Sequence, residues 1–319
     1  MTKRIKFPPL ENGLDYLTSV VEHLRDEPDQ RDLKYAVLHL QAAVEVLLKA
    51  RLIRQHWSLV FKDPNTASQS AFAKGDFQSI GLKDTLTRLT DIGVEVPKPA
   101  REQFLRLNKQ RNKLQHFGLE EQAIAIESLA GQVLDGLLCF IRDHLRPGAD
   151  HEDEQLLDQT QELIREEMER INTLVAARWF RIGPDLTNAG TVVHCPDCQH
   201  SALPIDEDLR CRFCDRTWEP DEAASEYAGI GLGLGLSWHE SVGALDGPLH
   251  TCMDCQHATL VRGATVQSNP NAHAWVCFNG CLAVGDQEIT GCLKCGVPIR
   301  RDHETGVCED CLHYAGGRD

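Results

Sequence analysis

The sequence lacks the features that would carry it into or across a membrane. No uninterrupted apolar run approaches the roughly 18 residues of a membrane-spanning helix. The first residues, MTKRIKFPPL, also lack the apolar centre of a signal peptide. We therefore expect a cytoplasmic protein with no membrane contact.

Cysteine is nearly absent from the first 194 residues, where Cys139 stands alone, and abundant afterwards. Cys139 falls in an apolar helical segment and is predicted to be a core residue. In a reducing cytoplasm, closely paired cysteines are more often metal ligands than disulfides. The other twelve cysteines form the pairs Cys195/Cys198, Cys211/Cys214, Cys252/Cys255, Cys277/Cys281, Cys292/Cys295 and Cys308/Cys311.

The spacing of these pairs predicts zinc. Two residues between cysteines let both sulfurs bind one tetrahedral ion, and a second pair completes the shell. The first and last sets of four have the spacing of zinc ribbons, whereas CFNGC, at 277–281, has three intervening residues. Pairing in chain order gives three structural Zn²⁺ sites per chain, and a cross-braced arrangement of the last four pairs is the alternative. Four thiolates also suit iron, although zinc is the commoner occupant.

Cations are scarce in the second half of the chain. Residues 150–319 hold 12 Lys+Arg against 29 Asp+Glu, whereas residues 1–149 hold 21 against 19. Three zinc ions bound by twelve thiolates would add about −6 to the second half. Such a surface repels phosphate, so we expect the cysteine-rich half to bind a protein or to regulate, and not to bind nucleic acid.

The first 149 residues have the pattern of a helical domain. Apolar residues at three- and four-residue spacing, with glycine and proline punctuation, predict the fold of this part. A polar, broken stretch at 57–81 predicts a long loop. The expected helices cover residues 10–25, 31–56, 82–92, 99–117 and 120–145.

The rest of the chain divides into smaller parts. Residues 150–190 are expected to hold a separate linker helix, over 152–180, that ends at Gly183-Pro184 and either lies on its own domain or pairs with its copy in a dimer. A first zinc ribbon at 191–226, a linker or hairpin at 227–249 that includes GIGLGLGL, and two further zinc sites at 250–319 follow. The predicted fold is thus a multidomain chain with an all-α bundle, a linker helix and small β-rich, metal-stabilised modules.

The helix at 99–117 carries polar residues where chemistry is possible. Arg111 continues the apolar stripe of Phe104 and Leu107, where a guanidinium needs a partner or a polar groove. Asn112 and His116 share another face, and the negative end of the helix favours an imidazolium at His116, which suits a proton donor. The same helix has a basic run, which is either a solvated face or an RNA-facing groove, at Lys98, Arg101, Arg106, Lys109, Arg111 and Lys113.

The segment RNKLQH at 111–116 resembles the R-x4-6-H motif of HEPN-domain ribonucleases, and AVLHLQAAVEVLLKARL at 36–52 resembles the helix that precedes it. The resemblance covers about residues 10–146, and HEPN domains followed by zinc ribbons occur among prokaryotic defence and toxin proteins. It implies a metal-independent endoribonuclease that acts as a homodimer on RNA, with tRNA among the candidate substrates.

The resemblance also implies roles for individual residues. In the implied reaction the ribose 2′-hydroxyl attacks the adjacent phosphate. His116 would move protons, Arg111 would stabilise the phosphorane, and Asn112 would orient one of these two side chains. Glu45 either contributes a polar contact or forms an ordinary surface pair with Lys49. The alternative is a catalytically inactive HEPN scaffold that docks partners through its zinc ribbons.

Overall fold

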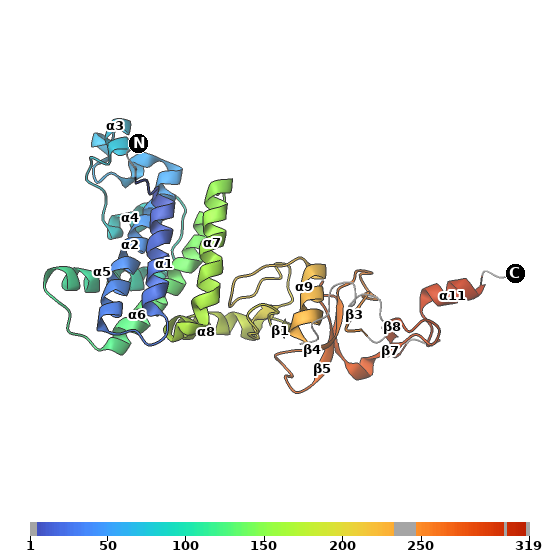
Figure 1. Ribbon diagram of the computed structural model, residues 1–319. Helices are drawn as coiled ribbons and strands as arrows, with labels where there is room; N and C mark the ends of the chain where they lie inside the picture. The colour runs from blue at the N-terminus through green and yellow to red at the C-terminus, as the bar shows by residue number, and fades with distance from the viewer. Residues whose placement is uncertain (1–4, 233–246, 303–304, 317–319) are drawn as a thin grey trace. The chain divides into compact units, whose positions relative to one another are not determined.

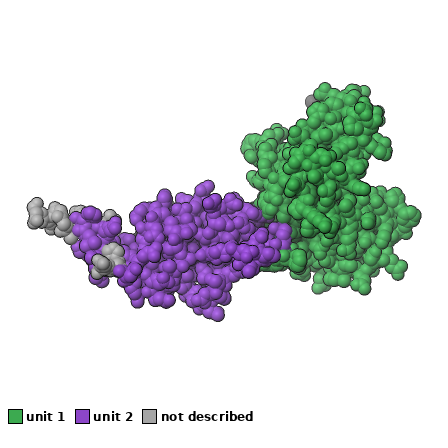
Figure 2. All heavy atoms as spheres, turned by 180° about the vertical axis from the view of Figure 1, so that it is seen from behind, with its two compact units in different colours: residues 1–180 green, residues 181–319 purple. Residues whose placement is uncertain are grey.

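The computed structural model describes residues 5–232, 247–302 and 305–316. The chain forms two compact units, residues 1–180 and 181–319 (Figure 2). Unit 1 is helical, whereas unit 2 combines short strands with the cysteine clusters (Figure 1).

Unit 1 is built around a long central helix. This helix, α2, contacts α1, α4, α5 and α6. Asp29 caps its N-terminus by accepting hydrogen bonds from the backbone N–H groups of Arg31 and Asp32. Gly13 of α1 lies so close to Leu47 of α2 that a Cβ atom there would come within 2.5 Å of the Leu47 side chain. The helices of this part are α1 (Pro9–Leu24), α2 (Gln30–Gln55), α4 (Leu82–Asp91), α5 (Lys98–His116) and α6 (Ala123–Phe140).

These helices confirm the expected helical segments to within a few residues, because apolar side chains at helical spacing form the core. Leu40, Val44 and Leu47 of α2 are fully buried, as are Phe104 and Leu107 of α5. The last expected helix changes character near its end, where Ile141–Leu145 forms a π-helical turn after α6.

Helix α6 and the π turn after it, Ala123–Leu145, are long and apolar enough to cross a membrane by length and composition. More than half of the apolar window is buried inside the protein, against α2 and α5. A central helix of a folded helical unit has this same composition.

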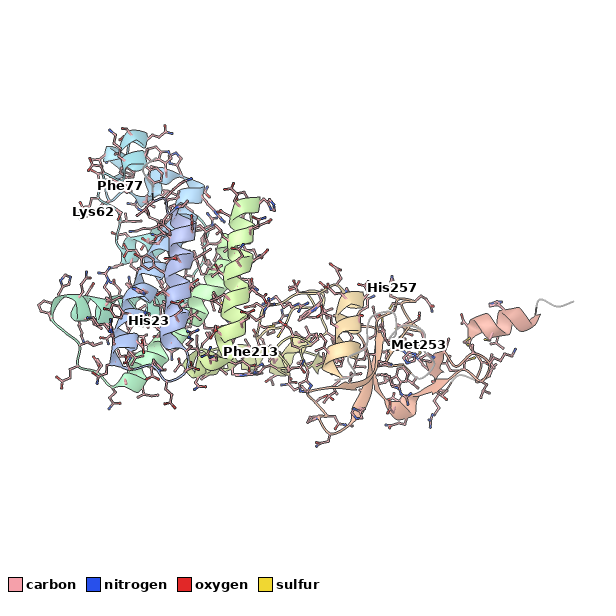
Figure 3. The ribbon with its side chains drawn as sticks, in the orientation of Figure 1. His23, Lys62, Phe77, Phe213, Met253 and His257 are labelled. Carbon is pink, nitrogen blue, oxygen red and sulfur yellow. The ribbon has the colours of Figure 1, made fainter. Side chains whose placement is uncertain are left out.

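The stretch at 57–81, predicted as a loop, is largely ordered. It contains short 3-10 helices at Trp57–Val60 and Pro64–Thr66 and the helix α3 (Gln69–Lys74). Rings of four aromatic residues pack on one another, among them Phe61 and Phe77, whose centroids lie 4.1 Å apart (Figure 3 labels Phe77). Aromatic packing therefore gives this segment a defined structure, although its polar composition predicts a loop.

The expected linker helix is two helices. α7 (His151–Glu167) ends in a 3-10 turn at Met168–Arg170, and α8 (Asn172–Asn188) follows. α7 packs against α1, so unit 1 extends to residue 180 and does not end at 149. α8 also continues through Gly183-Pro184, where the sequence predicted its end.

A buried ion pair joins α6 to α8 inside unit 1. Arg178 Nε donates to Asp135 Oδ1 at 2.9 Å, and both side chains are almost fully buried. Arg178 Nη1 also contacts Met168 Sδ at 3.3 Å. Near this ion pair, α6 and α8 lie so close together that a Cβ atom at Gly131 would come within 2.6 Å of the Thr173 backbone.

Unit 2 contains small antiparallel sheets, one for each set of four cysteines. β1 pairs with β2, β3–β6 form a four-stranded sheet in sequence order, and β7 pairs with β8. The elements are β1 (Val192–Val193), β2 (Leu203–Pro204), α9 (Pro220–Glu226), β3 (Leu249–His250), β4 (Leu260–Thr265), β5 (His273–Cys277), β6 (Ala283–Gly285), β7 (Ile289–Gly291), β8 (Pro298–Arg300) and α11 (Glu309–Gly316).

Most of the linker or hairpin expected at 227–249 lies outside the described residues, which leave out 233–246. Its beginning, Tyr227–Gly231, is a π-helical continuation of α9, and its end enters β3.

Candidate functional site

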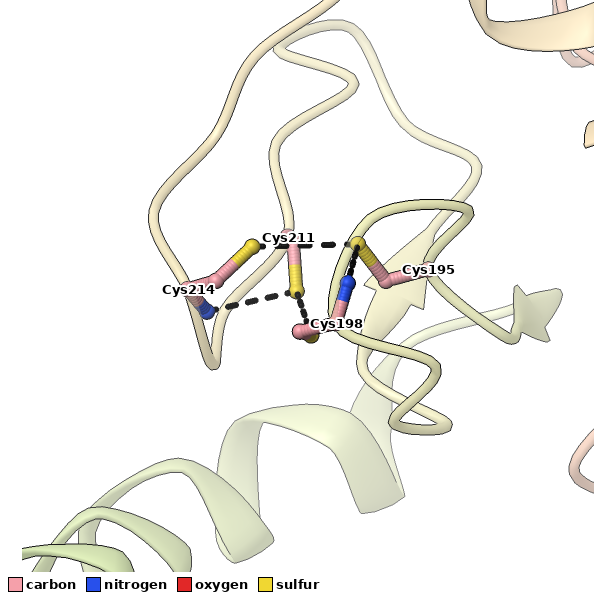
Figure 4. A group of neighbouring side chains, drawn as sticks. All are labelled: Cys195, Cys198, Cys211 and Cys214. Atoms are coloured by element: carbon pink, nitrogen blue, oxygen red, sulfur yellow. Dashed lines mark hydrogen bonds between the residues drawn. The ribbon is translucent and has the colours of Figure 1, made fainter. Parts of the chain in front are cut away.

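The cysteines come together in three groups of four, in chain order. Each group brings its sulfur atoms to within 4.8 Å of one another. The cross-braced alternative is therefore wrong. Figure 4 shows the first group, in which Cys195 and Cys198 face Cys211 and Cys214. The groups are Cys195, Cys198, Cys211 and Cys214; Cys252, Cys255, Cys277 and Cys281; and Cys292, Cys295, Cys308 and Cys311.

The sulfur separations fit a tetrahedral ion. A metal with four sulfur ligands at about 2.3 Å holds them about 3.8 Å apart. Sγ–Sγ distances are 3.7 Å for Cys195–Cys214 and 3.8 Å for Cys198–Cys211. The second group has 3.9 Å between Cys255 and Cys277, and the third has 3.5 Å between Cys295 and Cys308. All three groups could hold a metal ion.

The backbone repeats one turn around the first cysteine of several pairs. The N–H of Cys195 donates to the carbonyl of His200 at 2.8 Å, and the N–H of Gln199 donates back to the carbonyl of Cys195 at 3.0 Å. The same two bonds recur at Cys211, Cys252 and Cys292. The residue after each of these pairs has a positive φ, and these residues are Gln199, Asp215, Gln256 and Gly296.

Amide groups of these turns and of the facing cysteine pair point at sulfur. The N–H of Cys198 lies 3.5 Å from Cys195 Sγ, and that of Cys308 lies 3.3 Å from Cys292 Sγ. The backbone N–H of Cys308 and further amides lower the pKa of the Cys292 thiol to about 6. These amides stabilise a thiolate, the form that binds metal.

The three groups differ in exposure. Cys195, Cys211 and Cys214 are buried, whereas Cys281 of the second group is exposed. A small core of Leu260, Trp275 and Ile289 supports the second group.

The motif residues lie on the C-terminal turns of α5. Arg111 is partly exposed and Asn112 is exposed. Arg111 Nη1 donates to Asn112 Oδ1 at 3.0 Å, and Arg111 Nη2 lies 3.8 Å from Glu45 Oε2 of α2. The guanidinium thus has the partner that its place beside the apolar stripe requires.

Glu45 makes both contacts that the sequence left open. It accepts a hydrogen bond from Lys49 at 2.6 Å while it faces Arg111. One turn before it, Gln41 is buried and donates to Asn108 of α5 at 3.1 Å. A polar seam therefore lies between α2 and α5, and the i, i+4 spacing of Gln41, Glu45 and Lys49 was its sequence signal.

His116 is exposed on the last turn of α5 and contacts the ring of Phe117. Within the described part of one chain, it has no hydrogen bond to Arg111 or Asn112. A single chain therefore brings Arg111 and Asn112 into contact but not His116.

The basic run on α5 is partly neutralised by neighbouring segments. Glu121, after the end of α5, accepts from Lys113 at 3.1 Å, and this hydrogen bond lowers the pKa of the Glu121 carboxyl. Arg101 donates to the Thr90 hydroxyl at 3.2 Å. Arg106 and Lys109 remain exposed.

No protein-family model, curated protein or solved structure matches this chain. Interpretation of the site therefore depends on its residues and their geometry.

Proposed function

We propose that the chain is a metal-independent endoribonuclease of the HEPN type, with Arg111, Asn112 and His116 as its catalytic residues. The observation that carries the proposal is the accessibility of this motif. Arg111 is held by Glu45 and Asn112 at the surface, and His116 is exposed on the same helix end. Both side chains are therefore accessible to a phosphate.

The reaction requires only proton transfer and charge stabilisation. The ribose 2′-oxygen attacks the adjacent phosphorus and forms a P–O2′ bond, and the P–O5′ bond breaks. A base takes the 2′-hydroxyl proton and an acid protonates the departing 5′-oxygen, which gives a cyclic phosphate and a 5′-hydroxyl. His116 supplies proton transfer, Arg111 stabilises the negative phosphorane, and Asn112 orients the guanidinium.

A homodimer completes the site in this proposal. Arg111 and His116 project about 140° apart on a straight helix, so one copy directs them poorly to a single phosphate. A second α5 supplies the missing group. Exposed apolar side chains beside the motif support such a contact, since Phe117 is 91% and Ile124 65% exposed.

The test is cleavage of total RNA by the purified protein, with and without EDTA. His116→Ala is expected to lower the rate at least about 100-fold, as loss of a general acid or base does. His151→Ala, another exposed histidine of unit 1, is the matched control and should cleave normally. Equal cleavage by His116→Ala and the unsubstituted protein would refute the assignment.

We further propose that each cysteine group holds a structural Zn²⁺. Four protein sulfurs fill a tetrahedral shell, and zinc is the usual ion in such sites. Elemental analysis should find about three zinc ions per chain. Cys211→Ser should remove the zinc ion of the first group and leave the other two in place. Iron in place of zinc would contradict the assignment.

The scaffold alternative and a defence or toxin role also stay proposals. The scaffold predicts binding of RNA or a partner without cleavage, so the same RNA assay separates it from the enzyme.

A further inference from the structure

An open cavity of about 620 Å³ lies in unit 2, and its lining includes none of the residues of the proposed ribonuclease site. Its walls come from the segment at 205–209, from residues 217–220, from Glu222 and from Phe278, Asn279 and Gly280. The last three are the residues between Cys277 and Cys281. The additional residue in this cysteine pair thus belongs to a segment that forms one wall of the cavity.

Aromatic side chains in fixed positions line this cavity. Trp218 is 6% exposed, its Nε1 donates to Glu226 Oε2 at 2.9 Å, and the Arg216 guanidinium lies over its ring. Phe278 is 1% exposed, packs against the Tyr227 ring and donates its N–H to the carbonyl of Thr259 at 2.8 Å. These walls are held in place by the protein itself.

The charge of the lining has one sign. Among the described residues, no lysine, arginine or histidine lines the cavity, whereas five carboxylates do: Asp206, Glu207, Asp208, Glu219 and Glu222. Asp206 pairs with Arg212 at 2.5 Å. The other four are exposed and, in the part of the chain that the structure describes, have no ion pair.

We propose that this cavity binds a basic segment of a partner protein, with a lysine or arginine cation facing the exposed carboxylates of the lining. The alkyl stem of such a side chain packs on Ile205 and Pro220, which are the partly exposed apolar residues of the lining. A volume of this size exceeds one side chain, and an open mouth lets a peptide enter and leave. RNA is disfavoured, because unpaired carboxylates repel phosphate.

The probe is a fluorescein-labelled peptide of alternating arginine and glycine, measured by fluorescence anisotropy with the full-length, zinc-loaded protein. Glu207→Gln with Glu222→Gln removes two exposed carboxylates of the cavity and should weaken binding about tenfold or more. Asp286→Asn with Glu309→Gln changes the net charge equally at exposed sites outside the cavity and should bind within about twofold.

Four further measurements complete the test. A peptide with citrulline in place of arginine should lose binding, since it keeps the shape and loses the charge. Equal affinity of both double variants, or equal binding of the citrulline peptide, would overturn the proposal. Displacement of the peptide by spermine at equal charge concentration would assign the cavity to a free polyamine. Direct binding of labelled single-stranded RNA that Glu207→Gln with Glu222→Gln abolishes would assign it to nucleic acid. Either result rejects a protein partner. Unchanged zinc content shows that a variant is folded.

Discussion

Removal of Asp135 should destabilise unit 1 more than removal of any exposed carboxylate. In Asp135→Ala, the guanidinium of Arg178 stays buried between α6 and α8 without the carboxylate that accepts from its Nε at 2.9 Å. Met168 Sδ, which the same guanidinium contacts, is a weak acceptor and carries no charge.

The magnitude follows from the burial of the pair. Side-chain exposure is 2% for Arg178 and 5% for Asp135, so water does not replace the lost partner. Breaking such a pair from one side costs about 3–5 kcal/mol. Since domains are stable by about 5–15 kcal/mol, the free energy of unfolding should fall by roughly a fifth or more.

Urea unfolding of the full chain, followed by circular dichroism at 222 nm, measures this loss. Asp158→Ala removes the exposed partner of Arg146 and should change the free energy of unfolding by less than about 1 kcal/mol. Asp135→Leu with Arg178→Met removes both charges and should recover most of the stability. A loss below about 1 kcal/mol in Asp135→Ala would refute the reasoning, because the guanidinium would then have sufficient support elsewhere.

Three more predictions follow from the geometry. Gln256→Gly should raise the stability of the fold around the second cysteine group by about 1 kcal/mol, because glycine adopts the positive φ freely. Gly296→Ala should lower the stability of the fold around the third group for the converse reason, and competition with a chelator for added Zn²⁺ measures both effects. Burial lowers the pKa of the His39 imidazole, so the unfolded state binds more protons, and the stability of unit 1 should fall as the pH drops below about 6.5; His39→Gln should reduce this dependence in urea unfolding at pH 7 and 5.5. Mixing Arg111→Gln and His116→Ala proteins should restore roughly a quarter of the RNA cleavage rate, because half of the dimers then have one intact composite site; no recovery despite proven subunit exchange would contradict a shared site.

Most helices of unit 1 could be predicted because the buried stripes are unbroken. Leu33, Val37, Leu40, Val44 and Leu47 follow one face of α2 and are all buried. Where tertiary contacts decide the structure, prediction failed. The aromatic residues of 57–77 are dispersed among polar residues, and only their mutual packing orders the segment.

Proline also misled the prediction at the end of the expected linker helix. The sequence predicts that this helix ends at Gly183-Pro184, yet α8 includes Pro184. The break lies earlier, near Ile171, where the backbone leaves helical geometry without glycine or proline. Local propensity is weak when neighbouring helices supply the packing.

The cysteine groups were predictable because their spacing is itself the geometry of the site. The contact between Arg111 and Glu45 was harder to predict, since Glu45 is distant in sequence and its spacing to Lys49 fitted a surface pair equally well. The cavity of unit 2 could not be predicted from the sequence, because Trp218 and Phe278 in its lining lie beside different cysteine groups.

Pro184 has a mechanical consequence for α8. Proline has no N–H, so the carbonyl of Phe180, four residues earlier, lacks its regular helical donor. The Phe180 ring is itself 87% exposed and adds little packing there. The helix is therefore weakest where unit 1 gives way to unit 2, and bending or local opening of the chain should concentrate in this single turn.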